Sequence, residues 1–270
     1  MEVVVVPSAQ EMVSLAVHLI QTIVQSAQPS GRRITIALSG GSTPKKLYEV
    51  LCTEHTALLQ DRLEYYFEDV RMVEDGHKDS NFTMAFDSLL HVVSPEHIHV
   101  IRTQIDSKQA ALEYELELCR NFGSIEEVHF DLILLGIGGD GHTASLFPHT
   151  DASREVEKLV VACTPPSGVT PNVERVTVTK RVIWNARHVL VMAVGKEKKW
   201  VVDGIVSPDE EEREGDGCGA EEEKRQTKKE VPAEEEKRQT KKEVPVARLL
   251  RQCKGKVTIV VDGDAAPQRQ

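Results

Sequence analysis

The stretch FDLILLGIGGDGHTASLFP (residues 130–148) places a run of apolar residues directly before a glycine-rich turn. The run FDLILL (130–135) is apolar nearly throughout, which is typical of a strand that is covered on both faces. Such strands belong to parallel sheets that lie between layers of helices. The turn that follows, GIGGDG (136–141), matches G-x-G-x-x-G, the phosphate-binding fingerprint of dinucleotide-binding folds.

The residues around this turn do not support a dinucleotide site. A dinucleotide-binding fold continues from its glycines into a helix, and an acidic residue ends the next strand about 20 residues further on. Here Pro148 interrupts the helix, and the next strand candidate, LVVAC (159–163), does not end in an acidic residue. The fingerprint also normally opens the first strand–helix–strand unit, whereas this turn follows several strands. We therefore reject a nicotinamide or flavin cofactor.

The turn instead presents Asp140, Gly141 and His142 at the end of a buried strand. In doubly wound sheets, ligands bind beyond the carboxyl ends of the strands. Histidine has an unperturbed pKa of about 6.5, which makes His142 a natural proton acceptor at neutral pH. The spacing alone is equally consistent with a structural role, in which His142 caps a short helix that begins at Thr143.

Short β-branched runs alternate with helical patterns along most of the chain. We expect strands at residues 2–6, 34–38, 63–67, 97–101, 130–135, 159–163, 175–179, 188–194 and 256–261. We expect helices at residues 8–27, 44–54, 81–91, 107–121, 196–206 and 246–251. This alternation predicts an α/β fold, a Rossmann-like, doubly wound and mostly parallel sheet with helices on both faces. Because the alternation runs nearly from end to end, residues 1–270 are predicted to form one domain.

The acidic charge of the chain is concentrated in one segment. The 270 residues carry a net charge of -10, and residues 207–245 hold 14 acidic and 9 basic residues, half of that excess. An acidic chain without clustered Lys and Arg is not expected to bind nucleic acid. The segment contains AEEEKRQTKKEVP twice in tandem, at 220–232 and 233–245. Its polar composition predicts a mobile surface insertion, with a partner-docking arm as the alternative.

Several features bear on the location of the protein. No apolar run approaches the roughly 18 residues that a membrane span requires. The N-terminal MEVVVVPSAQ (1–10) is too short and too acidic for a signal peptide. The five cysteines are scattered and form no C-x-x-C pair, which favours a reducing compartment. The sequence therefore predicts a cytoplasmic protein that does not bind membranes.

A second glycine-rich turn lies in ITIALSGGSTPKKLYEVL (34–51). Gly40 and Gly41 expose backbone N–H groups, and Ser42 or Thr43 can cap the helix that follows. A helix start of this kind attracts anions, which predicts a phosphate site at these four residues. The Walker A pattern is absent, so a nucleoside triphosphate is not expected. The alternative is a serine esterase that uses Ser39, because ALSGG (37–41) is one glycine short of a nucleophile elbow.

The chain resembles the 6-phosphogluconolactonases, within the wider group that includes the glucosamine-6-phosphate deaminases. The resemblance covers nearly everything outside 207–245 and is most specific in GIGGDGHTASLFP (136–148). The other matching segments are SGGSTPKKLYEVL (39–51), FEDVRMV (67–73), DSNF (79–82), ERVTVT (174–179), VMAVGKEKKW (191–200) and VARLLRQCKGKVTIVVDGDAA (246–266). One departure concerns the usual Asp-Glu-Arg, which is Asp69-Val70-Arg71 here: the arginine is kept and the middle carboxylate is lost.

The resemblance implies hydrolysis of 6-phospho-D-glucono-1,5-lactone to 6-phosphogluconate, with neither a metal nor a cofactor. It implies that His142 activates water and that Asp140 orients the imidazole. It also implies the remaining substrate-binding residues, which are Arg71, Asn81, Arg175 and Lys198. A deaminase-like isomerase and a non-catalytic sugar-phosphate-binding protein are the alternatives. The expected partner is a small sugar phosphate, and the expected assembly is a monomer or weak oligomer.

Overall fold

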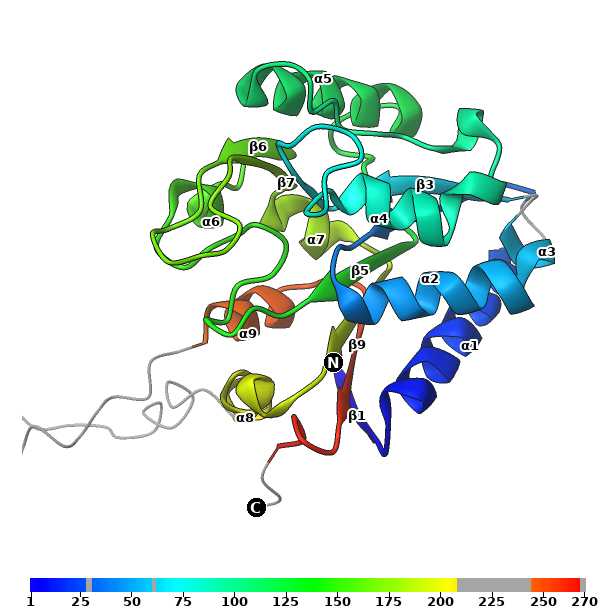
Figure 1. Ribbon diagram of the computed structural model, residues 1–270, viewed down its shortest axis with the longest axis vertical. Helices are drawn as coiled ribbons and strands as arrows, with labels where there is room; N and C mark the ends of the chain where they lie inside the picture. Colours follow the sequence, from blue (N-terminus) through cyan, green and yellow to red (C-terminus); the bar gives the residue numbers. More distant parts are fainter. Residues whose placement is uncertain (28–30, 60–61, 208–243, 268–270) are drawn as a thin grey trace, which may run out of the picture.

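A six-stranded parallel sheet lies at the centre of the computed structural model, which describes residues 1–27, 31–59, 62–207 and 244–267 (Figure 1). Every neighbouring pair of its strands is parallel. From edge to edge, the strands are β1 (Glu2–Val6), β9 (Lys256–Asp262), β8 (His188–Ala193), β5 (Leu132–Gly136), β2 (Ile34–Leu38) and β3 (Leu63–Phe67). The predicted mostly parallel α/β sheet is therefore confirmed.

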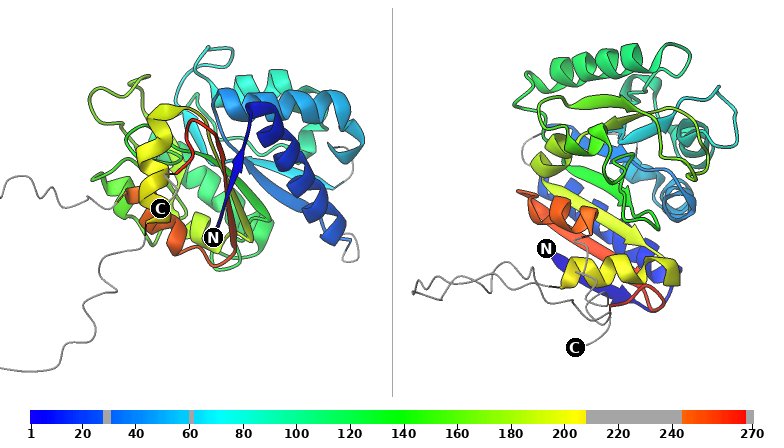
Figure 2. Two further views of the ribbon diagram at one scale, coloured as in Figure 1. Left: turned by 90° about the horizontal axis from the view of Figure 1, so that it is seen from below. Right: turned by 90° about the vertical axis from the view of Figure 1, so that its left-hand side faces the viewer.

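Helices cover both faces of this sheet, as the apolar strands require. The helices α1 (Ala9–Ala27) and α2 (Ser42–Glu54) pack together on one face, whereas α8 (Lys199–Val206) and α9 (Pro245–Arg251) pack together on the other (Figure 2). The indole N–H of Trp184, in α7 (Lys180–Asn185), donates to the Leu249 carbonyl of α9. The four leading residues of β5 are buried at the middle of this arrangement.

The order of strands reverses its direction between β2 and β5. The chain passes outward from β2 to the edge strand β3, returns to β5 on the other side of β2, and then continues through β8 to β9. The carboxyl ends of β2 and β5 are therefore the topological switch point of the sheet, where doubly wound folds form their ligand crevices. The loops after both strands contain the two glycine-rich turns of the sequence.

A smaller antiparallel sheet stands beside the switch point. It consists of β4 (Asp69–Arg71), β7 (Arg175–Val178) and β6 (Val160–Cys163) in that order, and α5 (Ser107–Phe122) packs against it. The strands expected at 159–163 and 175–179 thus belong to this sheet and not to the central one. The sequence did not predict β4, because three residues of which two are charged carry no strand pattern.

The strand expected at 97–101 is wrong. Its start forms the 3-10 helix η3 (Pro95–His97), and the rest makes a single parallel bridge, from Ile98 to Tyr65 of the edge strand β3. The alternating histidines of HIHVI contact a carboxylate and do not form one face of a strand. The imidazoles of His97 and His99 lie 3.2 and 2.9 Å from the carboxylate of Glu64, and the His99 ring stacks on Tyr66. A side-chain cluster therefore covers this sheet edge in place of another strand.

The remaining helices differ from expectation mainly at their ends. The helix expected at 81–91 is α4 (Asn81–Ser88) followed by the 3-10 helix η2 (Leu90–Val92), and that at 196–206 is η4 (Lys196–Lys198) followed by α8. The short helices α3 (Thr56–Leu59), α6 (Asp151–Arg154) and α7 were not predicted. Residues 208–243 of the charged insertion lie outside the described chain. None of the described helices is long and apolar enough to cross a bilayer.

A buried carboxylate ties the start of β2 to the start of β5. The Asp131 side chain is only 2% exposed, and both of its oxygens accept from the Arg32 guanidinium at 2.6 Å. The backbone N–H of Thr35 donates to the same carboxylate at 3.0 Å, and Arg187 lies 3.3 Å away. This cluster holds the two central strands in register at the edge opposite the switch point.

Replacing the buried carboxylate tests this role. We expect Asp131→Asn to lower the free energy of unfolding by roughly 2–4 kcal/mol, because it removes a charged acceptor that is buried and fully hydrogen-bonded. Urea unfolding measures the difference. Glu113→Gln, in the exposed pair with Arg102, is the matched control and should change stability by less than about 1 kcal/mol. Equal effects of the two substitutions would contradict the assignment.

Candidate active site

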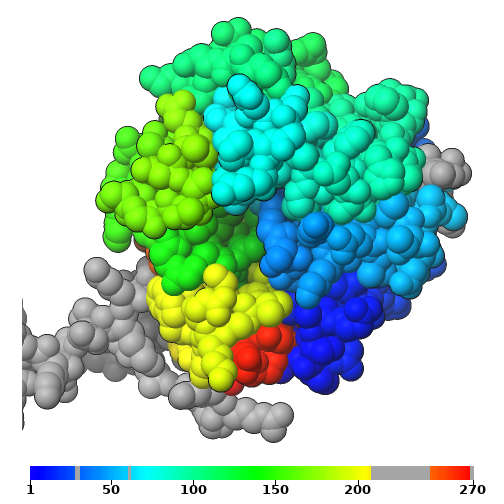
Figure 3. Space-filling view, in the orientation of Figure 1, coloured from blue at the N-terminus to red at the C-terminus, as the bar shows by residue number. Residues whose placement is uncertain are grey.

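A cavity of about 160 Å³ opens at the switch point, beyond the carboxyl ends of β2 and β5. The two sheets and the loops between them contribute its walls. Its lining residues are Ser39, Gly40, Glu68, Asp69, Arg71, Gly136, Ile137, Gly138, His142, Ala144 and Arg175. Figure 3 shows the parts of the chain around residues 40, 70 and 140 meeting on one face of the molecule. The two glycine-rich turns of the sequence therefore border one cavity.

The turn after β5 holds a histidine–aspartate pair at this cavity. The Nδ1 of His142 lies 2.5 Å from Oδ1 of Asp140, which also accepts from the His142 backbone N–H at 3.1 Å. Partial burial raises the pKa of Asp140, but the charge and hydrogen bonds of His142 outweigh this effect and the net pKa is lowered. The lowered pKa favours an ionised Asp140, which accepts a hydrogen bond from Nδ1–H of His142; in the neutral imidazole with this tautomer, Nε2 carries the lone pair.

Three neighbours hold this pair in place. Gly138 provides the space for it, because a Cβ at this position would lie 2.1 Å from Nδ1 of His142 and 2.6 Å from Oδ1 of Asp140. The ring of Phe147 packs against the imidazole with a centroid separation of 4.5 Å. The indole N–H of Trp200, in α8, donates to the Gly139 carbonyl at 2.9 Å. The alternative in which His142 caps a helix is wrong, since Thr143 forms a bridge with Leu146 and no helix begins there.

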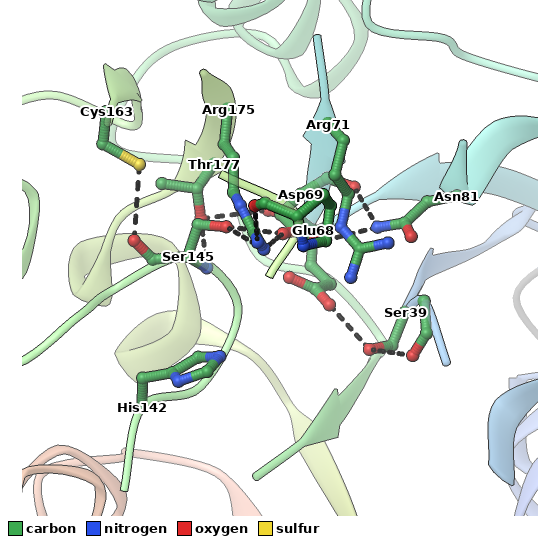
Figure 4. Close-up of polar contacts among 12 residues, drawn as sticks. Ser39, Glu68, Asp69, Arg71, Asn81, His142, Ser145, Cys163, Arg175 and Thr177 are labelled. Atoms are coloured by element: carbon green, nitrogen blue, oxygen red, sulfur yellow. Dashed lines mark hydrogen bonds and ion pairs between the residues drawn. The ribbon is translucent and has the colours of Figure 1, made fainter. Parts of the chain in front are cut away.

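Two arginines line the opposite part of the cavity. Arg71 and Arg175 are cross-strand partners in the antiparallel pair β4–β7 (Figure 4). Arg175 is 3% exposed, and its guanidinium lies over the Phe147 ring at 5.3 Å. Burial lowers the pKa of Arg175, Asp69 opposes this change, and Arg71 adds to it. The Nε atoms of both guanidiniums are buried without a hydrogen-bond partner among the described residues. The two side chains therefore bring positive charge to this part of the cavity.

Asp69 connects the arginine side of the cavity to the histidine turn. Its Oδ1 accepts from Nδ2 of Asn81 at 2.7 Å, and its Oδ2 accepts from the Ser145 hydroxyl at 2.6 Å. Arg175 lies 3.8 Å from the same Oδ2. The backbone N–H of Ser145 donates to the Thr177 hydroxyl of β7 at 3.2 Å. The loop that carries His142 is thus bonded to both strands that carry the arginines.

The structure brings together only part of the predicted phosphate site. Gly40 lines the cavity and contacts Asn81 so closely that a Cβ would lie 2.1 Å from its side-chain oxygen. Gly41, with φ of 110°, is the N-cap of α2, so neither Ser42 nor Thr43 caps this helix as expected. Those three residues and Lys198, in η4, are not among the residues that line the cavity.

Sequence reasoning missed several residues of this site. Glu68, Asp69, Ser145 and Phe147 were not predicted, although each lies inside a segment that carries the family resemblance. The loss of a carboxylate at Val70 leaves the cavity unaffected, because Val70 is 1% exposed and belongs to the hydrophobic core. Ser39 does not have the partner that a serine esterase needs. Its hydroxyl donates to Glu68 at 2.6 Å and lies near the Gly40 carbonyl, and no bond to a histidine is present among the described residues.

These features define a class: an α/β protein with an arginine-lined cavity and a histidine–aspartate pair at the switch point of a doubly wound sheet. The family model of glucosamine-6-phosphate isomerases and 6-phosphogluconolactonases matches residues 7–227. The chain belongs to this family. Among the described residues, no group of three or more His, Cys, Asp and Glu side chains is arranged to hold a metal ion.

Individual relatives agree with this membership. A Synechocystis protein named 6-phosphogluconolactonase is 38% identical over 214 residues, which are 77% of this chain and 86% of that protein. The structure of 6-phosphogluconolactonase from Trypanosoma cruzi superposes with a TM-score of 0.81 at 33% identity, covering 98% of this chain and 95% of that one. The enzyme from Leishmania guyanensis gives a TM-score of 0.80 at 31% identity, with 98% and 97% covered.

A methyl group at Gly138 tests whether this glycine maintains the His142–Asp140 pair. We expect Gly138→Ala to displace the imidazole, because the added Cβ cannot share the space of Nδ1. The downfield Nδ1–H resonance of His142 in ¹⁵N-histidine NMR spectra should disappear. Gly139→Ala is the matched control, since its Cβ would meet no atom within 4 Å, and it should keep the resonance. A resonance that persists in Gly138→Ala would contradict this account.

Proposed function

We propose that this chain is a 6-phosphogluconolactonase, a carboxylic ester hydrolase that opens 6-phospho-D-glucono-1,5-lactone to 6-phosphogluconate. One observation carries the proposal. The imidazole of His142, held through Nδ1 by Asp140, faces the same cavity as the arginines Arg71 and Arg175. The ester function and the phosphate of one small sugar derivative need these two chemical environments at opposite ends of one pocket. The names of the relatives support the same substrate.

The proposed reaction begins with water at the imidazole. Nε2 of His142 takes a proton from water as its oxygen attacks the lactone carbonyl carbon, and the carbonyl electrons move onto oxygen. The tetrahedral intermediate then collapses, the bond from carbon to the ring oxygen breaks, and the imidazolium returns its proton to that oxygen. The new carboxylic acid loses a proton to solvent at neutral pH. Acid–base catalysis of this kind typically contributes about 10²–10⁴-fold.

Asp140 contributes by holding the imidazole. Its carboxylate fixes the tautomer in which Nε2 is free, and its charge stabilises the imidazolium that forms during the attack. The intermediate also carries an oxyanion, which needs hydrogen-bond donors. The backbone N–H of Ile137, which borders the cavity, is the donor that we assign to it, since the Gly138 N–H already donates to the His142 carbonyl at 2.7 Å.

The two arginines are the principal phosphate ligands in this proposal. A guanidinium binds phosphate oxygens through parallel hydrogen bonds, and the buried, unpaired Nε atoms supply donors. Gly40 has no side chain, so the phosphate can approach its backbone closely at the same wall of the cavity. The substrate contacts the other predicted ligands only if it extends beyond the cavity. These ligands are Gly41, Ser42, Thr43 and Lys198. Asn81 acts through Asp69, to which its amide is bonded.

Removal of the imidazole tests the catalytic role. We expect His142→Ala to lower kcat by at least about 10²-fold with a modest change in KM, because the general base is lost while the phosphate ligands remain. The assay uses freshly made lactone and subtracts its spontaneous opening. His18→Ala, on the exposed face of α1, is the control and should keep full turnover. Near-normal kcat in His142→Ala would refute the mechanism.

Removal of the Arg71 guanidinium tests the anion site. We expect Arg71→Ala to raise KM by about 10- to 100-fold, since it removes charge-assisted hydrogen bonds to phosphate. Arg71→Lys should recover part of this loss, because lysine keeps the charge but not the paired donors. Arg102→Ala, in an exposed ion pair, is the control. An unchanged KM in Arg71→Ala would show that the phosphate binds elsewhere.

The two alternative functions give different results in the same experiments. A deaminase-like isomerase would release ammonia from glucosamine 6-phosphate, and we expect none. A sugar-phosphate-binding protein without turnover would bind the ligand but show no rate above spontaneous lactone opening. In that case His142→Ala would leave ligand affinity nearly unchanged and would have no rate to lower.

A further inference from the structure

Glu68 places a second carboxyl group in the cavity, beside Asp69. It follows β3 directly and is 2% exposed. Its backbone N–H donates to the Leu38 carbonyl at 3.0 Å, and its carbonyl accepts from the Val178 N–H at 2.8 Å. The residue is therefore fixed to β2 of the central sheet and to β7 of the smaller one. Its side chain is held separately, by the hydrogen bond that the Ser39 hydroxyl donates to Oε1.

The two oxygens of this carboxyl group are not equivalent. Oε1 accepts a hydrogen bond from the Ser39 hydroxyl at 2.6 Å. Oε2 is buried and has no hydrogen-bond partner within the part of the chain that the structure describes. Figure 4 shows the group between Ser39 and the two arginines, with one dashed line to Ser39. A buried polar atom without a partner is unfavourable by roughly 1–3 kcal/mol, so a ligand oxygen that reached Oε2 would relieve this cost.

The groups around Glu68 shift its pKa in opposite directions. Burial raises the pKa of Glu68 and Asp69 adds to the rise, while the hydrogen bond from Ser39 and the charges of Arg71 and Arg175 oppose it. The net pKa lies well above the ordinary value. Tyr48 of α2 and Tyr114 of α5 also face the group, and His142 lines the same cavity. Glu68 is therefore a neutral carboxylic acid over a wider pH range than an exposed glutamate.

The protonation of Glu68 decides the charge of the anion site. With Glu68 ionised, two carboxylates balance the two arginines, and the cavity has no excess charge to attract a phosphate. With Glu68 protonated, the arginines outweigh Asp69 and the cavity is positive. Because Ser39 already donates to Oε1, the acid proton belongs on Oε2, the atom without a partner. The neutral acid thus adds a donor to a cavity that must bind an acceptor.

We propose that Glu68 binds in its protonated form and donates a hydrogen bond from Oε2 to an oxygen of the anionic ligand, so that one proton enters the cavity with each anion wherever Glu68 is ionised in the free protein. The inference deepens the proposed function, on which it rests for the identity of the ligand. Glu68 is then a binding residue for the phosphate group of the substrate. It also ties affinity to pH, since ionisation of Glu68 removes a donor and adds a repelling charge together.

Sulfate is a suitable probe, because it mimics phosphate and keeps a constant charge between about pH 5 and pH 9. In wild-type protein, titration calorimetry at 25 °C should show that sulfate affinity falls as pH rises through the raised pKa of Glu68, by up to about tenfold per pH unit. Calorimetry in two buffers of different ionisation enthalpy should show uptake of close to one proton per sulfate above that pKa. All measurements are repeated with His142→Gln, which removes the titration of the imidazole.

Substitutions of Glu68 separate its effect as a hydrogen-bond donor from the effect of its charge. Glu68→Gln keeps the shape and a donor at the position of Oε2, so proton uptake should disappear and affinity at high pH should exceed that of wild type. Glu68→Met keeps the bulk without a donor and should bind sulfate about tenfold more weakly than Glu68→Gln. Glu74→Gln, at an exposed position, should behave as wild type. Thermal unfolding verifies that each variant is folded.

Each outcome of these measurements either supports or overturns the inference. The inference is overturned if wild-type protein binds sulfate without proton uptake across this pH range, a result that needs no variant. It is also overturned if Glu68→Gln takes up as many protons as wild type, or if it loses more than about tenfold in affinity at every pH. Proton-linked sulfate binding without any lactone hydrolysis would uphold the role of Glu68 and refute the proposed reaction.

Discussion

Two guanidinium groups, those of Arg71 and Arg175, stand opposite one another across the antiparallel pair β4–β7, and the whole cavity is organised around their repulsion. Like charges in directly opposed cross-strand positions are destabilising, and the burial of Arg175 makes the arrangement more costly. The protein provides only partial compensation. Asp69 lies 3.8 Å from Arg175, the Phe147 ring lies beneath it, and both Nε atoms remain without partners. In the proposed function, the anionic group of the substrate supplies the partners that these groups lack among the described residues.

The same region joins the two sheets. The central parallel sheet supplies the histidine turn after β5, and the smaller antiparallel sheet supplies both arginines. Hydrogen bonds through Ser145 connect the two, since its hydroxyl donates to Asp69 and its backbone N–H donates to Thr177. Ala144 beside it has a φ of 50°, a left-handed conformation that is uncommon for a residue with a side chain. The loop after His142 therefore adopts the conformation that the contacts with the second sheet require.

The charge distribution divides the cavity into two environments. Asp140 is partly exposed and paired with the imidazole, and its pKa is lowered. Glu68 is buried among the arginines and Asp69, and its pKa is raised. The pKa values of Asp140, beside the cavity, and of Glu68, in its wall, are thus shifted in opposite directions, because one group faces an imidazole and solvent while the other is removed from water. Such a separation suits a site that must keep one acceptor for an N–H group and present one donor to an anion.

The local sequence was sufficient to predict an element wherever the composition of that segment decides its conformation. The strands 34–38 and 63–67 have the predicted bounds, because both segments are rich in β-branched or aromatic residues and four of the five residues in each are buried. Prediction from the local sequence failed where contacts with residues distant in the chain determine the conformation. HIHVI (97–101) has a strand pattern, but Glu64 and Glu117 bind its histidines at a sheet edge. Likewise β4 forms only because β7 provides its hydrogen bonds.

The sequence by itself determined the class of fold and the two glycine-rich turns, and the resemblance implied that Asp140 orients His142; the structure then showed the contact between them. These features depend on contacts within a few residues, such as the space that Gly138 leaves beside His142. Only the tertiary structure decided which cations share the cavity, and it selected Arg71 and Arg175 over Lys198. It alone identified Glu68, because burial and the field of distant charges set the protonation of a carboxyl group, and neither property is encoded in its immediate sequence neighbours.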